Sequence, residues 1–380
     1  MSTVLVTGGA GFIGSRLVHL LLGAGHSVTV LDNLSPQIHG PNPEHSPLYG
    51  SIRGRVKFIR GDVTNREDWS RSLTGQEVIV HLAAETGTGQ SMYQIERYSS
   101  VNVRGTALML DLLANEKHSV RRVVIASSRA VYGEGQYSCG ACGDVYPDTR
   151  RTQRLTAGEF EPQCPRCGGC VAVRPTVESA PFRPASIYGI TKQTQEQLVA
   201  SCCTALGIPY VVFRYQNVYG PGQSLANPYT GILSVFSTRI LNGNAIDIYE
   251  DGEESRDFVL VDDVAAATLM GVEHNGIDGC ALNVGTGRGV TVREVADLLC
   301  KLYGIDVPIA VSGRFRPGDI RHAIADTSKV SKVLGFKPQI AFEDGLARFA
   351  SWVKTQSVET DRYDESVEEM DRRGLMGRKR

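Results

Sequence analysis

The chain has 380 residues, of which 40 are basic and 41 acidic, so its formal net charge is −1. This balance provides no basic surface for nucleic acid, and we therefore expect no nucleic-acid partner. A hydrophobic fraction of 42% excludes a disordered chain, and the length is ample for a large core and for more than one domain. The 41 glycines suit an α/β enzyme with many tight turns.

The cellular location is predicted from features that the sequence lacks. No apolar run approaches the roughly 18 residues of a membrane span, so no membrane partner is expected. No signal peptide precedes the first strand, because Met1-Ser2-Thr3-Val4 runs directly into it. We therefore expect a cytoplasmic protein whose nine cysteines are reduced, metal-bound or catalytic rather than joined in disulfides.

Short apolar runs alternate with helical patterns along much of the chain. Such runs, rich in β-branched residues and separated by helices, indicate a parallel sheet covered on both faces. This is the α/β doubly wound parallel sheet of the Rossmann type. The expected strands are 4–7, 28–32, 56–59, 78–84, 123–128, 210–214 and 281–284.

Changes in composition divide the chain into expected parts. The charged tail is expected to be solvated and frayed. The parts are an NAD-binding Rossmann domain at 1–133 and 179–216, a Cys-rich, zinc-ribbon-like insertion at 134–178, a smaller C-terminal substrate-binding domain at 217–355 with some segments returning to the Rossmann sheet, and the charged tail at 356–380.

A glycine-rich turn between the first strand and the first helix predicts a dinucleotide site. Gly9, Gly11 and Gly14 satisfy G-x-G-x-x-G, and Gly8 adds a second three-residue spacing. Glycines let the backbone approach a pyrophosphate, which the helix N-terminus stabilises. Asp32 ends the second strand, where its carboxylate can bind both ribose hydroxyls and would repel a 2′-phosphate. The pattern favours NAD over NADP.

Three other strand-end residues leave two interpretations open. Asp62 can meet the amino group of adenine or can simply end a turn. Ala83 and Ala84 are small enough for close approach of the cofactor, but packing explains them equally well.

A tyrosine and a lysine at i and i+4 form the candidate catalytic pair. Tyr188 and Lys192 share one face of a helix, and a nearby cation stabilises a phenolate and lowers the pKa of the phenol. Ser127 and Ser128 add hydroxyls at the carboxyl end of a strand, where such folds bind ligands. Each feature alone is common: the pair arises by chance, and the serines can cap a strand end.

Together with the glycine loop, these residues resemble the extended short-chain dehydrogenase/reductase family, specifically its nucleotide-sugar epimerases. The resemblance extends over roughly residues 2–355. Its motifs, in chain order, are Thr7-Gly8-Gly9-Ala10-Gly11-Phe12-Ile13-Gly14, Asp32-Asn33, Gly61-Asp62-Val63, His81-Leu82-Ala83-Ala84, Asn102-Val103-Arg104-Gly105-Thr106, Ser127-Ser128, Val131-Tyr132-Gly133, Tyr188/Lys192, Arg214 to Pro221, Arg256-Asp257-Phe258-Val259, Asn283 to Gly287 and Arg316-Pro317-Gly318-Asp319.

The chemistry within this family depends on the residues before the Val-Tyr-Gly turn. The 4,6-dehydratases carry an Asp-Glu pair where this chain has Arg129 and Ala130, and the related decarboxylases carry a glutamate at the position of Ala130. Neither reaction is therefore expected. Ser128 falls where the 4-epimerases carry their catalytic Ser or Thr, which leaves epimerisation by transient oxidation.

The resemblance implies a role for each matched residue. Tyr188 would take the C4 hydroxyl proton, with Ser128 as relay and Lys192 lowering the tyrosine pKa, while hydride passes from C4 to NAD. The implied substrate contacts are Ser128, Asn217, Arg256 and Arg316. The implied NAD contacts are Gly8, Gly11, Phe12, Ile13, Gly14, Asp32, Asn33, Asp62, Val63, Leu82, Ala83, Ala84, Asn102, Tyr188, Lys192 and Tyr215.

Several local runs are similar to the dTDP-L-rhamnose 4-epimerase group, which interconverts dTDP-L-rhamnose and dTDP-6-deoxy-L-talose. The alternatives are a UDP-sugar 4-epimerase, a net nucleotide-sugar oxidoreductase and, more remotely, a non-catalytic NAD-binding regulator. The resemblance also implies a homodimer formed by helices near 93–115 and 188–206. The runs are 34–40, 89–93, 214–217 and 227–231.

Four cysteines in the insertion form two C-x-x-C knuckles, Cys139/Cys142 and Cys164/Cys167. The 21 residues between the knuckles are close to the spacing of a four-thiolate zinc ribbon. A structural zinc ion is therefore expected, with Cys170 as a substitute ligand; free thiols in a loop are the alternative. Because the insertion lies between Ser128 and Tyr188, we expect a metal-stapled flap beside the sugar pocket.

Overall fold

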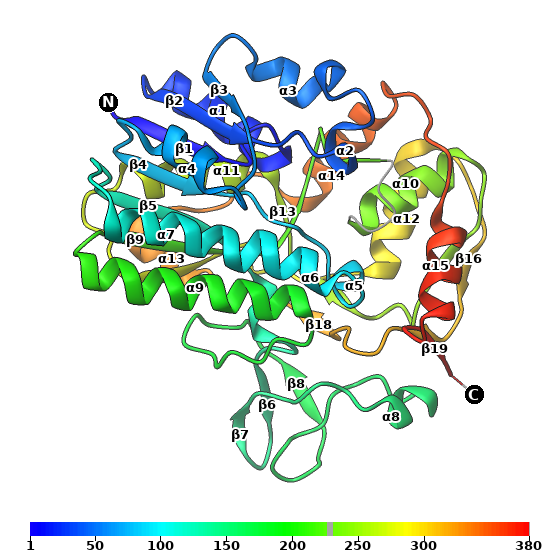
Figure 1. Cartoon of the computed structure of the whole chain (residues 1–380). Helices are drawn as coiled ribbons and strands as arrows, with labels where there is room; N and C mark the ends of the chain where they lie inside the picture. The colour runs from blue at the N-terminus through cyan, green and yellow to red at the C-terminus, as the bar shows by residue number, and fades with distance from the viewer. Residues whose placement is uncertain (226–230, 380) are drawn as a thin grey trace.

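The computed structural model describes residues 1–225 and 231–379. Residues 227–230 of the run 227–231, one of the sequence features similar to the rhamnose epimerases, lie outside this part of the chain. The centre of the molecule is a seven-stranded parallel sheet in the order β14-β9-β5-β4-β1-β2-β3 (Figure 1). Its strands are β1 (Thr3–Thr7), β2 (Ser27–Asp32), β3 (Lys57–Arg60), β4 (Val78–His81), β5 (Arg122–Ser128), β9 (Tyr210–Tyr215) and β14 (Cys280–Val284).

Helices cover both faces of this sheet, because apolar side chains alternate along its strands. In β1, Val4 and Val6 belong to one core and Leu5 to the other. This confirms the predicted doubly wound α/β fold. The first core takes in α1 (Phe12–Gly23), α3 (Pro47–Ile52), α11 (Val261–Glu273) and α13 (Ser328–Leu334). The second takes in α4 (Arg66–Leu73), α7 (Gly105–Asn115) and α9 (Ile187–Leu206).

A third apolar core lies in the C-terminal half and is built mainly from helices. Short strand pairs surround it, while β14, α11 and α13 pack with or in the large sheet. The helices are α10 (Ile232–Leu241), α12 (Val292–Tyr303) and α14 (Phe342–Val353). The strand groups are β10 (Asn217–Tyr219) with β13 (Phe258–Leu260), β11 (Ile246–Ile248) with β16 (Ile309–Val311), and β12 (Ser255–Arg256) with β15 (Val290–Thr291) and β18 (His322–Ala323).

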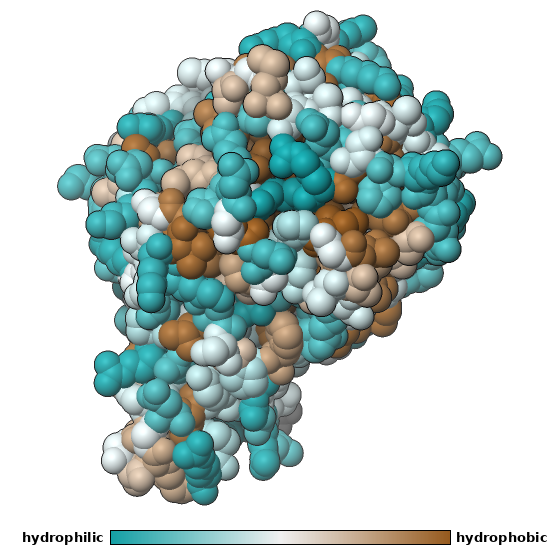
Figure 2. All heavy atoms as spheres, turned by 90° about the vertical axis from the view of Figure 1, so that its left-hand side faces the viewer, coloured by the Kyte–Doolittle hydropathy of each residue, from teal (hydrophilic) through white to brown (hydrophobic). Residues whose placement is uncertain are grey.

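The Cys-rich insertion is a small lobe with its own antiparallel sheet. It projects from the body of the molecule (Figures 1 and 2). Its core consists of the buried Tyr137, Cys139, Val145 and Cys164 with the partly buried Cys142, Val171 and Val173 packed against them. So small an apolar cluster is too little to fold without a further constraint. Its elements are β6 (Tyr137–Cys139), β7 (Gly143–Val145), β8 (Val171–Val173) and α8 (Thr152–Thr156).

The charged C-terminal segment is ordered, so the expectation of a frayed tail is wrong. It forms α15 (Tyr363–Arg372) and β19 (Gly377–Arg378), and β19 pairs with β17 (Arg314–Phe315). Val367 and Met370 are buried, because they share one face of α15 while the charged residues occupy the other.

Membrane insertion of a helix finds no support in the described part of the chain. None of its helices combines the length and the apolar character needed to cross a bilayer.

Candidate active site

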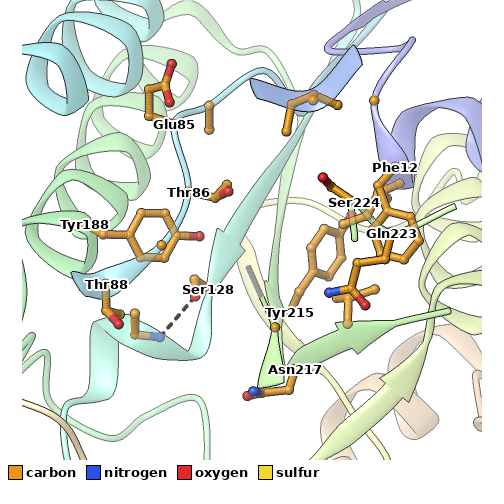
Figure 3. Close-up of a pocket in the computed structure, with 18 of the residues that line it drawn as sticks. Phe12, Glu85, Thr86, Thr88, Ser128, Tyr188, Tyr215, Asn217, Gln223 and Ser224 are labelled. Atoms are coloured by element: carbon orange, nitrogen blue, oxygen red, sulfur yellow. Dashed lines mark hydrogen bonds between the residues drawn. The ribbon is translucent and has the colours of Figure 1, made fainter. Parts of the chain in front are cut away.

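A cavity of about 610 Å³ runs along the carboxyl ends of the parallel strands. Its walls come from the glycine loop on one side and from the C-terminal half on the other. In Figure 3, Tyr188 enters from one wall and points its hydroxyl into the cavity, while Phe12 and Tyr215 lie on the opposite side. In doubly wound folds, ligands bind at this edge of the sheet.

The glycine loop shows why small residues are required. Gly8 has a φ of +69°, and a Cβ placed on it would lie 2.8 Å from the Ala83 nitrogen. A Cβ on Gly14 would collide with the Gly8 carbonyl oxygen. At Gly11 the nearest atom is the Gly8 oxygen at 3.3 Å, so the loop presents open backbone next to the first turn of α1. The shape of this cradle suits a pyrophosphate.

Asp32 lines the same end of the cavity, at the end of β2. Its carboxylate accepts hydrogen bonds from the backbone N–H groups of Ala10 (3.0 Å) and Leu34 (2.9 Å). Burial raises the pKa of Asp32, and these two hydrogen bonds oppose the rise. A fixed carboxylate at this position fits the ribose of NAD.

Two residues predicted to contact the cofactor do not line the cavity. The carboxylate of Asp62 accepts hydrogen bonds from Asn33 (2.9 Å) and Thr64 (2.8 Å); burial alone would raise its pKa, but these bonds hold the pKa below its usual value. Asn102 is fully buried and bonds to the backbone of Glu85 and, at 2.9 Å, to the hydroxyl of Thr191. Both residues instead bond to neighbours that do line the cavity, Asp62 to Asn33 and Asn102 to Glu85.

The other predicted cofactor and substrate residues come together around the one cavity. They are Gly8, Gly11, Phe12, Ile13, Gly14, Asp32, Asn33, Val63, Leu82, Ala83, Ala84, Ser128, Tyr188, Lys192, Tyr215, Asn217, Arg256 and Arg316.

The catalytic pair is held by a well-capped helix. The side chain of Ser186 accepts a hydrogen bond from the Gly189 N–H at the start of α9, and Gly207 ends the helix in the left-handed conformation. Tyr188 is thus in the first turn and Lys192 one turn later. The Lys192 ammonium donates to the Ala126 carbonyl oxygen at 2.8 Å and lies 6.0 Å from the centre of the Tyr188 ring.

The groups that act on the pKa of Tyr188 differ from the sequence-based expectation, in which Lys192 lowers that pKa. Burial raises the pKa of Tyr188, whereas a hydrogen bond with Ser128 and the charge of Arg129 lower it. Burial also lowers the pKa of Lys192 to about 7, against the attraction of Glu196. Ser128 and Arg129 therefore favour the phenolate directly.

Arg129 is a functional candidate that the sequence reasoning did not assign to substrate binding. Its Nε donates to Asn217 Oδ1 at 2.8 Å, it lines the cavity, and burial lowers its pKa to about 10. Within the described residues it forms no ion pair with a carboxylate. The sequence feature that could have indicated this role is the position of Arg129, a cation directly after Ser128.

The two arginines predicted to hold a diphosphate are fixed by the same short segment. Arg256 donates to the carbonyl oxygens of Ile320 (2.8 Å) and Arg321 (2.9 Å). Arg316 bonds to the carboxylate of Asp319 at 2.7 Å, and its side chain is still 37% exposed. Arg316 thus keeps donors available to a ligand anion.

The C-terminal segment also supplies part of the cavity wall. Tyr363, Ser366 and Met370 of α15 line it. Sequence reasoning missed this contribution, although the i, i+3 spacing of the apolar residues Val367 and Met370 was a signal for a packed helix.

The four knuckle cysteines converge at the tip of the insertion. Their Sγ atoms all lie within 4.8 Å of one another, and Cys139 and Cys167 are 3.6 Å apart. Tetrahedral zinc with bonds of about 2.3 Å would separate the sulfurs by about 3.8 Å, so the donor set fits the ion. Cys170 is exposed and lies outside this set.

Comparison with known proteins agrees with this geometry. The NAD dependent epimerase/dehydratase family matches residues 4–152 and 167–285, leaving out 153–166 within the insertion. The chain is 37% identical over 352 residues to a dTDP-L-rhamnose 4-epimerase of Burkholderia thailandensis, covering 92% of this chain and 94% of that protein. It is 29% identical to a putative UDP-glucose 4-epimerase of Methanocaldococcus jannaschii, covering 93% and 99%.

Solved structures show the same relationship. A UDP-glucose 4-epimerase of Thermotoga maritima with UDP-glucose superposes with a TM-score of 0.74 at 29% identity, covering 93% of this chain and 98% of that one. The Thermus thermophilus UDP-glucose 4-epimerase in complex with NAD also gives 0.74, at 27% identity, with 93% and 100% covered. The predicted resemblance to nucleotide-sugar 4-epimerases is confirmed, and the chain is an enzyme of the NAD-dependent epimerase/dehydratase family.

Proposed function

We propose that this enzyme epimerises C4 of a nucleoside-diphosphate sugar, interconverting dTDP-L-rhamnose and dTDP-6-deoxy-L-talose. One observation carries the proposal: Ser128 and Tyr188 lie in the same cavity as the glycine cradle and Arg316, while Arg129 and Ala130 replace the dehydratase acids. The identity to the Burkholderia enzyme supports the choice of sugar nucleotide. NAD, held by the glycine cradle and Asp32, would supply a reversible acceptor for the C4 hydride.

The residues of the chain account for the proton transfer. The Tyr188 phenolate accepts the proton of the C4 hydroxyl, directly or through Ser128, as C4 is oxidised to a ketone. The same proton returns to the C4 oxygen when the ketone is reduced on its other face, so the reaction consumes no net proton or electron pair. Arg129 stabilises the phenolate through its charge. Lys192 would hold the nicotinamide ribose when NAD is bound.

A UDP-sugar is the second candidate substrate. The relatives named UDP-glucose 4-epimerases support it, and thymine and uracil differ by one methyl group, worth about 0.8 kcal/mol of burial. A net oxidoreductase would need the same residues. A purely NAD-binding regulator would not need Tyr188, Ser128 and Lys192 together in one cavity.

The insertion is proposed to hold one structural zinc ion on Cys139, Cys142, Cys164 and Cys167. The support is the convergence of four sulfur atoms in a lobe with a very small apolar core. Zinc would supply the folding free energy that this core lacks.

A homodimer is proposed to form across the helices on the outer side of the sheet. In Figure 1, α7 and α9 lie side by side on the face turned toward the viewer. Ile95, Ile190 and Leu206, from this region, are at least 38% exposed. Unpaired apolar side chains on neighbouring helices are typical of an interface between subunits.

Removing the Tyr188 hydroxyl tests the proton transfer. We expect Tyr188→Phe to lower kcat by about 10²–10⁴-fold while bound NAD is retained, because only the acid–base group is lost. The matched control is Tyr303→Phe, whose hydroxyl bonds to Ser237 in the third core. Full activity of Tyr188→Phe would refute the mechanism.

NMR of the C4 configuration tests the substrate. We expect purified enzyme to convert dTDP-L-rhamnose into a mixture of both C4 epimers without accumulation of NADH. Conversion of UDP-glucose should have a kcat/KM at least about tenfold lower. Preference for UDP-glucose would favour the second candidate, stoichiometric NADH would indicate an oxidoreductase, and bound NAD without turnover would indicate a regulator.

Metal analysis tests the zinc site. The purified chain should contain about one zinc ion, and Cys142→Ser should lose it and lower the melting temperature. Cys170→Ser, three residues beyond the cluster, should keep the metal. Less than about a tenth of an equivalent in carefully handled wild-type protein would contradict the site.

Light scattering tests the dimer. At micromolar concentration the particle mass should be near twice the 41.2 kDa of one chain, and Ile190→Glu should reduce it to that of a monomer, because burying an unpaired charge is costly. Val358→Glu, at a similarly exposed position elsewhere, is the control. A wild-type monomer would rule out the interface.

A further inference from the structure

A buried cluster of charges joins the insertion to the C-terminal half of the enzyme. Glu134 and Arg150 come from the insertion, and Glu250 and Arg321 from the other half; each side chain is at most 5% exposed. Buried charges are tolerated only when paired and well hydrogen-bonded. Attaching a surface lobe does not require the free-energy cost of burying charged side chains, which suggests that the cluster has a role beyond attachment.

Arg150 uses its planar fork to reach four partners at once. Its Nε donates to Glu134 at 3.0 Å, and one terminal nitrogen donates to Glu250 at 2.8 Å and to the Phe160 carbonyl oxygen at 3.0 Å. The other terminal nitrogen donates to the Asp319 carbonyl oxygen at 3.0 Å. A lysine ammonium cannot span this set of acceptors.

The segment 319–321 is held by the insertion on one side. Besides the bond from Arg150 to Asp319, the Arg321 N–H donates to the carboxylate of Glu134 at 2.8 Å. The Arg321 guanidinium bonds to Glu161 at 2.6 Å. Three residues of the insertion thus fix two residues of the main body, Asp319 and Arg321.

The same segment holds the two arginines of the cavity on its other side. Asp319 binds Arg316 through its carboxylate, and Arg256 donates to the carbonyl oxygens of residues 320 and 321. A displacement of this segment would therefore move both arginines. Phe160 adds an apolar contact, because it packs with Phe315, the neighbour of Arg316.

Pairing of the Glu250 carboxylate with arginines also favours binding of a diphosphate in the cavity. Glu250 lines the cavity and would repel the two negative charges of a diphosphate if it were unpaired. Arg150 and Arg321 both bind it, at 2.8 Å and 3.0 Å, so the negative charge of Glu250 is compensated inside the cluster.

We propose that Arg150 is a positioning residue for the diphosphate of the substrate, through which the insertion controls the affinity of the cavity for nucleoside diphosphates. Arg150 touches no reacting atom; it acts through Asp319 and Glu250 on Arg316 and Arg256. The inference rests on the proposed nucleotide-sugar function but not on the identity of the sugar. Because Arg150, Phe160 and Glu161 lie between the two cysteine knuckles, a metal at the knuckles would stabilise this contact.

Calorimetric binding of dTDP and of UDP tests the proposal without requiring turnover. Arg150→Met should weaken binding of the preferred nucleotide about tenfold or more, equivalent to about 1.4 kcal/mol, while the NAD content stays that of the wild type. Arg150→Lys should lie in between, because it keeps the charge but not the fork. Arg154→Met is the matched control, since the one ion pair of Arg154 among the described residues is with the exposed Glu159, also in the insertion.

A double-mutant cycle separates positioning from general destabilisation. If Arg150 acts in part through Arg316, then Arg150→Met should weaken binding by a smaller factor in the background of Arg316→Ala than in the wild type. Additive losses, or wild-type nucleotide affinity in a folded Arg150→Met enzyme, would overturn the proposal. If Arg150→Met neither folds nor retains NAD, the same binding measurements are made with Arg150→Lys. The same outcomes then support or overturn the proposal.

The binding assay also distinguishes this proposal from the proposed reaction. Nucleotide binding that depends on Arg150 without epimerisation would overturn the reaction but leave the positioning role intact. A wild-type enzyme that binds neither dTDP nor UDP would overturn both.

Discussion

Parallel pairing of β5 with β9 and of β1 with β4 is the constraint on which the site depends. It places Ser128 opposite Tyr215 and Thr7 opposite His81, so the residues that follow these strands emerge at one edge. The glycine turn after β1 and the alanines after β4 meet there because Gly8 lacks a side chain. Without this common edge, residues from distant parts of the chain would not share a cavity.

Burial then determines the chemistry at that edge. Burial shifts the pKa of Tyr188 upward and that of Lys192 downward, so it disfavours the charged form of both groups. Nearby polar groups counteract this: Ser128 by a hydrogen bond and Arg129 by its charge. The same low-polarity environment strengthens the interaction of a bound diphosphate with Arg316.

The sequence predicted those features of the enzyme whose residues lie close together along the chain. The glycine loop, Asp32 and the Tyr188/Lys192 pair depend on spacing within one turn or one helix, and the cysteine knuckles on two short motifs. The positions of Asp62 and Asn102 behind the wall depend on partners elsewhere in the chain, namely Asn33 and Thr191. For the same reason, the contacts of Arg150 across 169 residues to Asp319 leave no trace in local sequence. Because α15 is rich in charged residues, composition alone did not reveal its apolar face.

The position of α15 has a consequence for the order in which the enzyme matures. The glycine loop and Asp32 are encoded before residue 130, whereas Tyr363, Ser366 and Met370 complete the cavity wall, and β19 pairs beside Arg316. The core behind the glycine loop also needs α11, which packs against α1 and is encoded after residue 260. Neither side of the cavity is therefore complete until the C-terminal part of the chain has been synthesised, and a truncated chain would lack support for the cofactor side as well as the substrate side.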